Sequence, residues 1–160
     1  MQKKVVVTRV FDAVVELVWK VWTEPQLVMR WWGPDKFTCR SAIIDFREGG
    51  RSLVNMTAPT EMGGKVWFSI WDYQKIIPLK RIEFIQNLAD KNGTKMNPVS
   101  VGMPADFPED IRTVVTFKEL ASNKTEMTVT EYADFGQTSH FAKLGLEQCF
   151  DKMASIFAKA

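Results

Sequence analysis

The sequence has few of the residues that build metal centres and disulfide frameworks. It contains two cysteines, Cys39 and Cys149, which lie far apart in the chain, and a single histidine, His140. These residues cannot form a CxxC zinc motif, a histidine-rich metal site or more than one disulfide. We therefore expect no metal and no cofactor. Both cysteines are expected to be reduced thiols that pack as small hydrophobic residues.

Charge of one sign and long apolar runs are also missing. Lys and Arg number 21 against 19 Asp and Glu, which gives a net charge of +2, and the two signs are interspersed. No basic stripe exists to bind a phosphate backbone, so nucleic acid is excluded as a partner. No apolar run approaches the roughly 18 residues that span a bilayer, and Arg9 and Asp12 interrupt the start before a signal peptide could form. A cytoplasmic protein without a membrane span is expected.

Hydrophobic residues, by contrast, are plentiful. They make up 46% of the 160 residues, and a chain of this length buries on the order of 70% of its unfolded surface. That burial supports a core without a disulfide or metal. No repeat, low-complexity tract or linker divides the chain, so a single domain over residues 1–160 is expected.

The N-terminal part predicts one strand and two short helices. A β-branched strand over residues 4–11 is followed by Asp12 as a helix N-cap and by an apolar stripe of helical spacing over residues 13–22. Thr23 to Gln26 resembles a capping box for a second helix, which Gly33 and Pro34 stop.

The rest of the chain predicts an antiparallel meander closed by a long helix. The six further strands are expected at 38–47, 51–57, 65–76, 80–88, 111–119 and 125–132. Residues 89–110 form a loop with three prolines, too long for a passive connection, and serve either as a lid or as a decoration. Residues 138–159 carry a broad apolar side and predict about 22 helical residues, enough to cross the sheet.

This order of elements predicts an α+β fold: a curved seven-stranded antiparallel sheet with two short helices and one long C-terminal helix. Strands of a strongly twisted sheet diverge from a single covering helix at the edges. A cavity between the helix and the sheet is therefore expected.

Several blocks of sequence, in this order, resemble the activator of heat-shock-chaperone ATPase homologue (AHSA-type) branch of the START-like, or SRPBCC, superfamily. The blocks are Trp22-Thr23-Glu24-Pro25, Arg30-Trp31-Trp32-Gly33-Pro34, Asp45-Phe46-Arg47-Glu48-Gly49-Gly50-Arg51, Ile76-Ile77-Pro78-Leu79-Lys80-Arg81-Ile82 and Gly102-Met103-Pro104-Ala105-Asp106-Phe107-Pro108. The resemblance implies a helix-grip (START-like, birch-pollen-allergen-like) fold with a mostly apolar cavity. Members often carry a tryptophan near Leu146-Glu147-Gln148, which this chain lacks, so its cavity is expected to differ in shape.

Aromatic residues and methionines supply the expected ligand wall. Trp67 and Trp71 share one strand face with Ser69 and Tyr73, because side chains alternate along a strand. Such a face suits a ligand, although plain core packing explains it equally well. The predicted ligand-binding residues are Trp31, Phe46, Met56, Trp67, Trp71, Tyr73, Phe84, Phe117, Phe141 and Met153.

The signal for catalysis is thinner, and no catalytic residue is assigned. The sequence contains no GxSxG-like nucleophile elbow whose serine could act with His140. Asp72, Glu83 and Glu131 interrupt strands, and any of them that faced an apolar cavity would have a raised pKa suited to acid or base chemistry. Solvent-facing positions are the more common arrangement for such carboxylates. The same holds for the strand arginines, which are Arg40, Arg47, Arg51 and Arg112.

Three functions remain open. The first is non-enzymatic binding of a small hydrophobic or aromatic molecule between the sheet and the C-terminal helix. The second, implied by the resemblance, is regulation of a chaperone ATPase through protein contact. The third is a cyclase- or hydrolase-type enzyme that acts on an aromatic substrate in the cavity. A homodimer is also possible through a sheet edge or the second helix.

Overall fold

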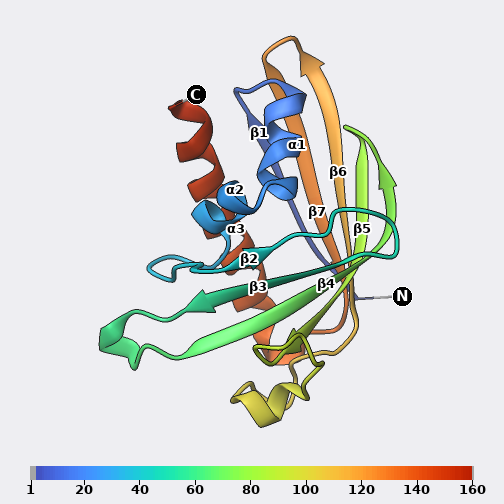
Figure 1. Ribbon diagram of the computed structural model, residues 1–160. Helices are drawn as coiled ribbons and strands as arrows, with labels where there is room; N and C mark the ends of the chain where they lie inside the picture. The colour runs from blue at the N-terminus through green and yellow to red at the C-terminus, as the bar shows by residue number, and fades with distance from the viewer. Residues whose placement is uncertain (1–2, 160) are drawn as a thin grey trace.

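One antiparallel sheet organises the protein, and its helices cover one face of that sheet (Figure 1). The computed structural model describes residues 3–159, and within them seven strands pair in the order β1-β7-β6-β5-β4-β3-β2. The strands are β1 (Val5–Phe11), β2 (Ala42–Ile43), β3 (Arg51–Thr57), β4 (Val66–Ile77), β5 (Arg81–Ala89), β6 (Ile111–Ala121) and β7 (Lys124–Tyr132). The helices are α1 (Val15–Thr23), α2 (Pro25–Trp31) and α3 (Ser139–Ala158), with 3-10 turns η1 (Thr60–Met62), η2 (Pro98–Val101) and η3 (Gly136–Thr138).

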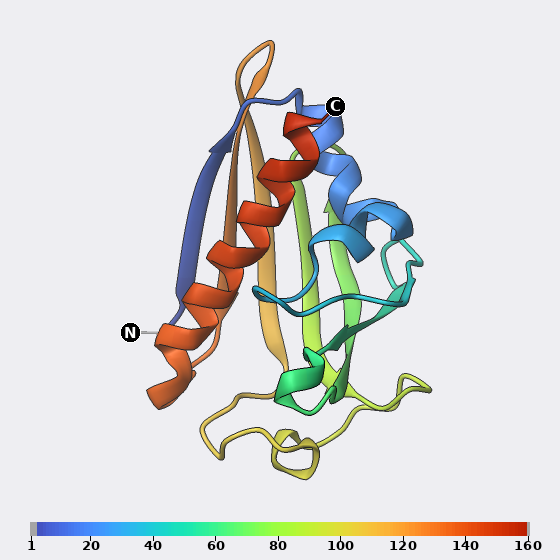
Figure 2. The same cartoon turned by 90° about the vertical axis from the view of Figure 1, so that its left-hand side faces the viewer.

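The predicted α+β architecture is confirmed. The hairpin order follows the chain from β2 to β7, and β1 returns to pair with β7 at the far edge. Helix α3 runs diagonally across the concave face of the sheet, with α1 and α2 beside its C-terminal half (Figure 2). No helix within residues 3–159 is both long enough and apolar enough to cross a membrane.

The strand expected at 38–47 is much shorter than predicted. Only Ala42 and Ile43 pair with β3, and Thr38 makes one isolated bridge to Thr57. After β2 the chain leaves the ladder in a tight turn, where the Arg47 amide donates to the Asp45 carbonyl at 3.0 Å. Apolar content alone did not reveal this turn, because the segment before it still alternates like a strand.

The predicted helix caps are also wrong. The N-cap of α1 is Val14, and the Asp12 carboxylate instead accepts from the Lys124 ammonium at 2.8 Å. Thr23 is the last residue of α1, and Glu24 precedes α2 without a side-chain capping bond. Pro25 at the first helical position starts α2 without needing such a bond, since its missing N–H would have had no partner there.

Helices α1 and α2 close one half of the concave face with packed aromatic rings. The Trp22 and Trp31 rings lie 4.6 Å apart, and the Trp71 and Phe84 rings lie 5.2 Å apart. The Trp31 indole donates to the Val21 carbonyl at 2.6 Å, which ties α2 to α1. Trp71 is 0% exposed, so this half of the interior is solid.

The other half of the concave face lies beneath the start of α3 and the loop between β5 and β6. The buried residues of α3 begin at Leu146, and its first two turns stand clear of the sheet. Figure 2 shows that end of the helix far from α1 and α2, at the side of the sheet where the long loop between β5 and β6 hangs. The two halves of one sheet face therefore differ, and the space lies beneath the start of α3.

The two tryptophans on the inner face of β4 test this division. Trp71→Ala should lower the free energy of unfolding by about 3 to 5 kcal/mol, because it empties a space in the solid half. Trp67→Ala, on the same strand face but half-buried at the open half, should lower it by clearly less. Chemical denaturation of both variants measures the difference, and equal losses would contradict it.

Candidate functional site

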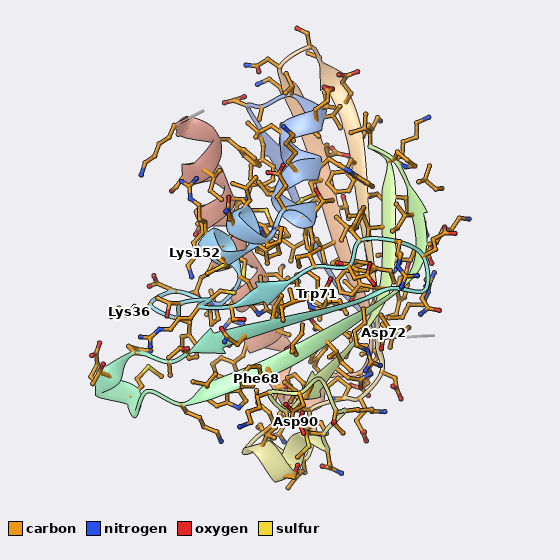
Figure 3. The ribbon with its side chains drawn as sticks, in the orientation of Figure 1. Lys36, Phe68, Trp71, Asp72, Asp90 and Lys152 are labelled. Carbon is orange, nitrogen blue, oxygen red and sulfur yellow. The ribbon has the colours of Figure 1, made fainter. Side chains whose placement is uncertain are left out.

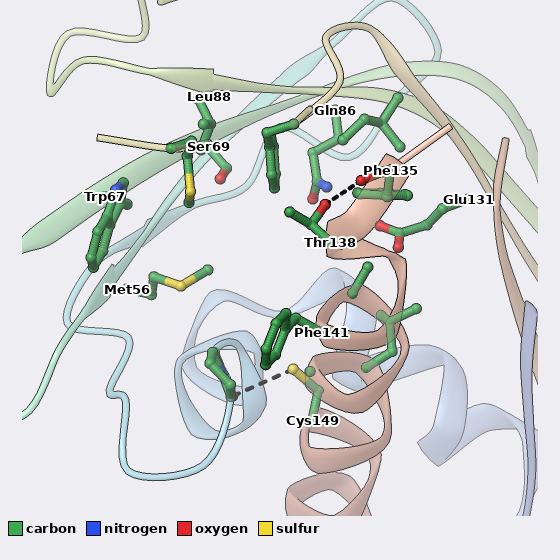
Figure 4. Close-up of a pocket in the computed structure, with 18 of the residues that line it drawn as sticks. Met56, Trp67, Ser69, Gln86, Leu88, Glu131, Phe135, Thr138, Phe141 and Cys149 are labelled. Carbon is green, nitrogen blue, oxygen red and sulfur yellow. Dashed lines mark hydrogen bonds between the residues drawn. The ribbon is translucent and has the colours of Figure 1, made fainter. Parts of the chain in front are cut away.

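A cavity of about 350 Å³ opens between the start of α3, the inner face of the sheet and the loop between β5 and β6 (Figure 4). Its deep wall consists of the buried residues Ile111, Glu131, Phe135, Leu146 and Cys149. Its rim consists of the less buried residues Met56, Trp67, Met103, Phe107 and Phe141. Most of the lining is apolar, which suits an uncharged or largely hydrophobic guest.

Three of the ten predicted ligand-binding residues line this cavity. Met56 comes from β3, Trp67 from β4 and Phe141 from the exposed start of α3. Trp67 and Ser69 lie at the open end of the β4 face, whereas Trp71 and Tyr73, further along the same face, lie at the closed end. The four residues share one face of β4, and the cavity occupies only one end of it.

The other seven predicted residues are placed in the hydrophobic core instead. Four of them lie on strands of the sheet, one on α2, one on α3 and one in the turn after β2, and none lines the cavity. Phe46, for example, packs edge-on against Trp19 at 5.5 Å and against Tyr73 at 5.1 Å. The residues concerned are Trp31, Phe46, Trp71, Tyr73, Phe84, Phe117 and Met153.

Sequence reasoning missed the part of the wall that comes from loops. Met103, Pro104 and Phe107 of the long β5–β6 loop line the cavity, and the Phe107 ring meets Phe135 edge-on at 5.8 Å. The sequence predicts this loop to be a lid or a decoration, but it does not indicate which of its side chains line the cavity. The run of prolines gave the only signal, and it does not say which residues turn inward.

Glu131 is the one predicted strand carboxylate that lines the cavity. It lies on the inner face of β7 and is 7% exposed (Figure 4). Removal from water raises the pKa of its carboxyl to about 7, and a hydrogen bond with Gln86 offsets part of that rise. Val5 of β1 and Thr113 of β6, its register partners, carry no charge. The cavity thus contains one buried acid.

The remaining catalytic candidates lie outside the cavity. Asp72 is on the opposite face of β4 from Trp71, where it pairs with Arg51 (Figure 3). Glu83 pairs with Arg81 at 2.6 Å and with Arg112 at 3.0 Å on the same outer face, and these arginines hold its pKa below the usual range. His140 is exposed beside Phe141. Within residues 3–159 no cluster of three or more His, Cys, Asp or Glu side chains is placed to bind a metal.

A lysine of α3 holds in place the part of the cavity wall that is formed by the turn after α2. The Lys152 ammonium donates to the carbonyls of Gly33, Pro34 and Phe37 at 2.8, 3.0 and 2.9 Å. Cys149, one turn earlier, donates its thiol to the Gly33 carbonyl at 3.4 Å. Gly33 adopts a φ of 111°, which favours glycine, and both Gly33 and Pro34 line the cavity. Lys152 and the turn that contains Lys36 are labelled in Figure 3.

Removing the Lys152 ammonium should loosen this wall. Lys152→Met keeps the apolar stem but removes the charged donor shared by three carbonyls, of which Gly33 keeps the Cys149 thiol and Pro34 keeps the Phe37 amide, so the free energy of unfolding should fall by roughly 2 to 3 kcal/mol. Lys143→Met, on the exposed side of the same helix, should change it by less than about 0.5 kcal/mol. Denaturation of the two variants checks this, and an unchanged Lys152→Met would show that the turn is held by other contacts.

The buried Glu131 should make stability depend on pH with a definite sign. Its carboxyl holds a proton in the folded state up to about pH 7, whereas the unfolded chain releases it near the ordinary value of 4.5. Between these values the folded state binds more protons, so the free energy of unfolding falls as pH rises, by up to about 3 kcal/mol. Glu131→Gln removes this penalty. The free energy of unfolding of the variant minus that of the wild type should therefore be larger at pH 8 than at pH 5.

The control for this measurement is Glu83→Gln. The pKa of Glu83 is lowered by its arginines, so its contribution is present above the unfolded pKa and is lost as pH falls. Glu83→Gln should accordingly lose stability at both pH 5 and pH 8, since both lie above the ordinary value of 4.5, and should show no gain at pH 8 relative to pH 5. Denaturation curves at the two pH values that show no pH-dependent gain for Glu131→Gln would contradict the burial of an ionisable acid in this cavity.

Comparison with solved structures places this arrangement in a known fold. A protein from Arthrobacter aurescens has a TM-score of 0.80 at 21% identity, covering 98% of this chain and 87% of the other. The AHSA1-like protein from Aeromonas hydrophila gives 0.72 at 17% identity, covering 96% and 90%. The AHSA1 protein from Silicibacter pomeroyi gives 0.76 at 12% identity, covering 98% of both chains.

Similarity at these identities shows the shared fold and no more. No curated protein matches the sequence. The sequence model of the family described as "Activator of Hsp90 ATPase homolog 1-like protein" matches residues 12–158. This match extends from just before α1 to the end of α3, and it confirms the resemblance seen in the sequence blocks. The chain therefore belongs to the AHSA1-like family of the SRPBCC superfamily, with its helix-grip fold.

Proposed function

We propose that the protein binds a small hydrophobic or aromatic molecule in the cavity beneath the start of α3, without chemical conversion. The observation that carries this proposal is the cavity itself, whose volume of about 350 Å³ lies at the lower end of the range for small-molecule sites. Its lining combines aromatic rings and methionine side chains, and methionines adapt to the shape of a guest.

Gly145 keeps this cavity open. It lies in the middle of the exposed half of α3, where glycine costs about 1 kcal/mol relative to alanine. A Cβ built at Gly145 meets no atom within 4 Å, so no close packing explains the glycine. Gly145 lines the cavity, and a side chain there would extend into the space that a guest would use.

The rim offers apolar surface to an arriving molecule. Phe141 lines the cavity although its side chain is 70% exposed, which is unusual for a phenylalanine on a helix. Trp67 faces the cavity from β4, and its indole donates to the Val101 carbonyl at 3.0 Å, which fixes the ring. An aromatic guest can stack on such rings at little cost in side-chain entropy.

The distribution of charge supports binding over catalysis. Of the strand residues considered for an enzyme, Asp72, Glu83 and Arg112 form ion pairs on the outer face of the sheet. Glu131 faces the cavity, but among the described residues the lining holds no histidine, lysine, arginine or second carboxylate to act with it. Contact with a chaperone ATPase rests on the description of the family and not on this cavity.

Filling the cavity from Gly145 tests the proposal. Gly145→Leu should weaken binding of the neutral fluorescent probe N-phenyl-1-naphthylamine at least tenfold, because the new side chain takes the guest's place. The fold should remain, since leucine is a better helix former than glycine. Fluorescence titration measures the affinity, and thermal unfolding verifies the fold.

The matched control adds the same side chain to the exposed side of α3. Lys143→Leu should bind the probe as the wild type does. A wild type that does not bind the probe, or a Gly145→Leu variant that binds it equally well, would contradict the proposal.

A further inference from the structure

The cavity contains a single group that can carry a charge near neutral pH. Its lining includes two ionisable residues, Glu131 and Cys149, and no lysine, arginine or histidine. Cys149 stays neutral, because burial raises the pKa of its thiol to about 12 and the thiol already donates to the Gly33 carbonyl. The charge available to a guest is therefore that of one carboxylate.

Glu131 has no cationic partner among the residues that the structure describes. Among residues 3–159 its carboxylate forms no ion pair with any lysine, arginine or histidine. Lys152, which holds the Gly33 and Pro34 part of the cavity wall, donates its ammonium to three carbonyls. A buried carboxylate without a cation is costly, and a ligand that supplies one relieves that cost.

Other acceptors surround the same interior. Gln86 and Thr138 line the cavity together with Glu131, and Figure 4 shows all three side chains facing its interior. The Thr138 hydroxyl donates its hydrogen to the Phe135 carbonyl at 2.6 Å, so its oxygen can act towards a guest only as an acceptor. A carboxylate, an amide oxygen and a hydroxyl oxygen match the three N–H donors of an alkylammonium group.

We propose that the ligand is a small apolar molecule with a protonated amine at one end, bound with the amine at Glu131 and the apolar body towards Trp67 and Phe141. This inference rests on the proposed function and names its ligand class. The deep position of Glu131 and the position of both rings at the rim set the direction of entry. Fatty acids and other anions are disfavoured, since their charge would meet Glu131 with no cation to offset it.

Four probes that share one aromatic body test this preference. They are 1-naphthylmethylamine, 1-naphthalenemethanol, 1-methylnaphthalene and 1-naphthoic acid, which place an ammonium, a hydroxyl, a methyl or a carboxylate at the same position. Calorimetric titration at pH 8 should find the amine roughly tenfold to hundredfold tighter than the methyl compound, as expected for a charge-assisted hydrogen bond. The alcohol should fall between them, and the acid should bind most weakly.

Glu131→Gln removes the charge and keeps the shape of the side chain. In this variant the ratio of amine to methyl affinity should fall to within a few-fold of one, while the methyl compound still binds. Glu126→Gln changes the same residue type on the outer face of the same strand and should keep the wild-type ratio. Unfolding curves establish that both variants are folded.

The outcomes separate this inference from the proposed function. Binding of the methyl compound with no preference for the amine, an acid that binds as tightly as the amine, or a ratio that Glu131→Gln leaves unchanged would overturn the amine assignment alone. The amine assignment would also be overturned if the alcohol bound more tightly than the amine and the amine bound no more tightly than the methyl compound. If none of the four probes binds the wild type, both proposals fail.

Discussion

The fit of α1 and α2 against one half of a curved sheet determines the rest of the structure. Helix α3 alone cannot follow a twisted seven-stranded surface, so the two short helices fill the half that it leaves beside its C-terminal end. Their tryptophans meet Trp71 and Phe84 there and exclude any guest. No equivalent element packs beneath the start of α3, where Gly145 contributes no side chain either. The cavity is thus the uncovered remainder of a face that is otherwise packed like any core.

Within the cavity, the group that can carry a charge near neutral pH is the carboxyl of Glu131. The inner face of β7 carries otherwise uncharged residues, and Glu131, which is 7% exposed, is the charged residue near its end. An acid in this position destabilises the folded protein above neutral pH, which a purely structural role does not require. Groups whose burial lowers stability are often placed for function, because stability and ligand recognition make different demands on the same residue. This residue is therefore the basis of the proposed preference for a protonated amine.

The fold could be predicted from the sequence much further than the site. Period-two alternation, the glycine and asparagine turns and the long apolar stripe of α3 are local signals, and they placed nearly every element. The strand face of Trp67, Ser69, Trp71 and Tyr73 was also predictable, because alternation fixes which residues share a face. The position of α1 and α2 along that face depends on tertiary packing. The sequence therefore could not show that Trp67 lines the cavity whereas Trp71 is packed in the core. The inward turn of Phe107 and the burial of Glu131 likewise depend on contacts between segments distant in the sequence.

One half of the concave face is solid and the other is proposed to hold a guest, and methionine side chains lie in both halves. Met56 and Met103 line the cavity, whereas Met127 and Met153 are 0% exposed in the packed half. The most direct measurement is a set of intermolecular nuclear Overhauser effects between bound 1-methylnaphthalene and methyl-labelled methionines. The account predicts contacts from the probe to Met56 and Met103 and none to Met127 or Met153. Contacts to the second pair without the first would contradict it.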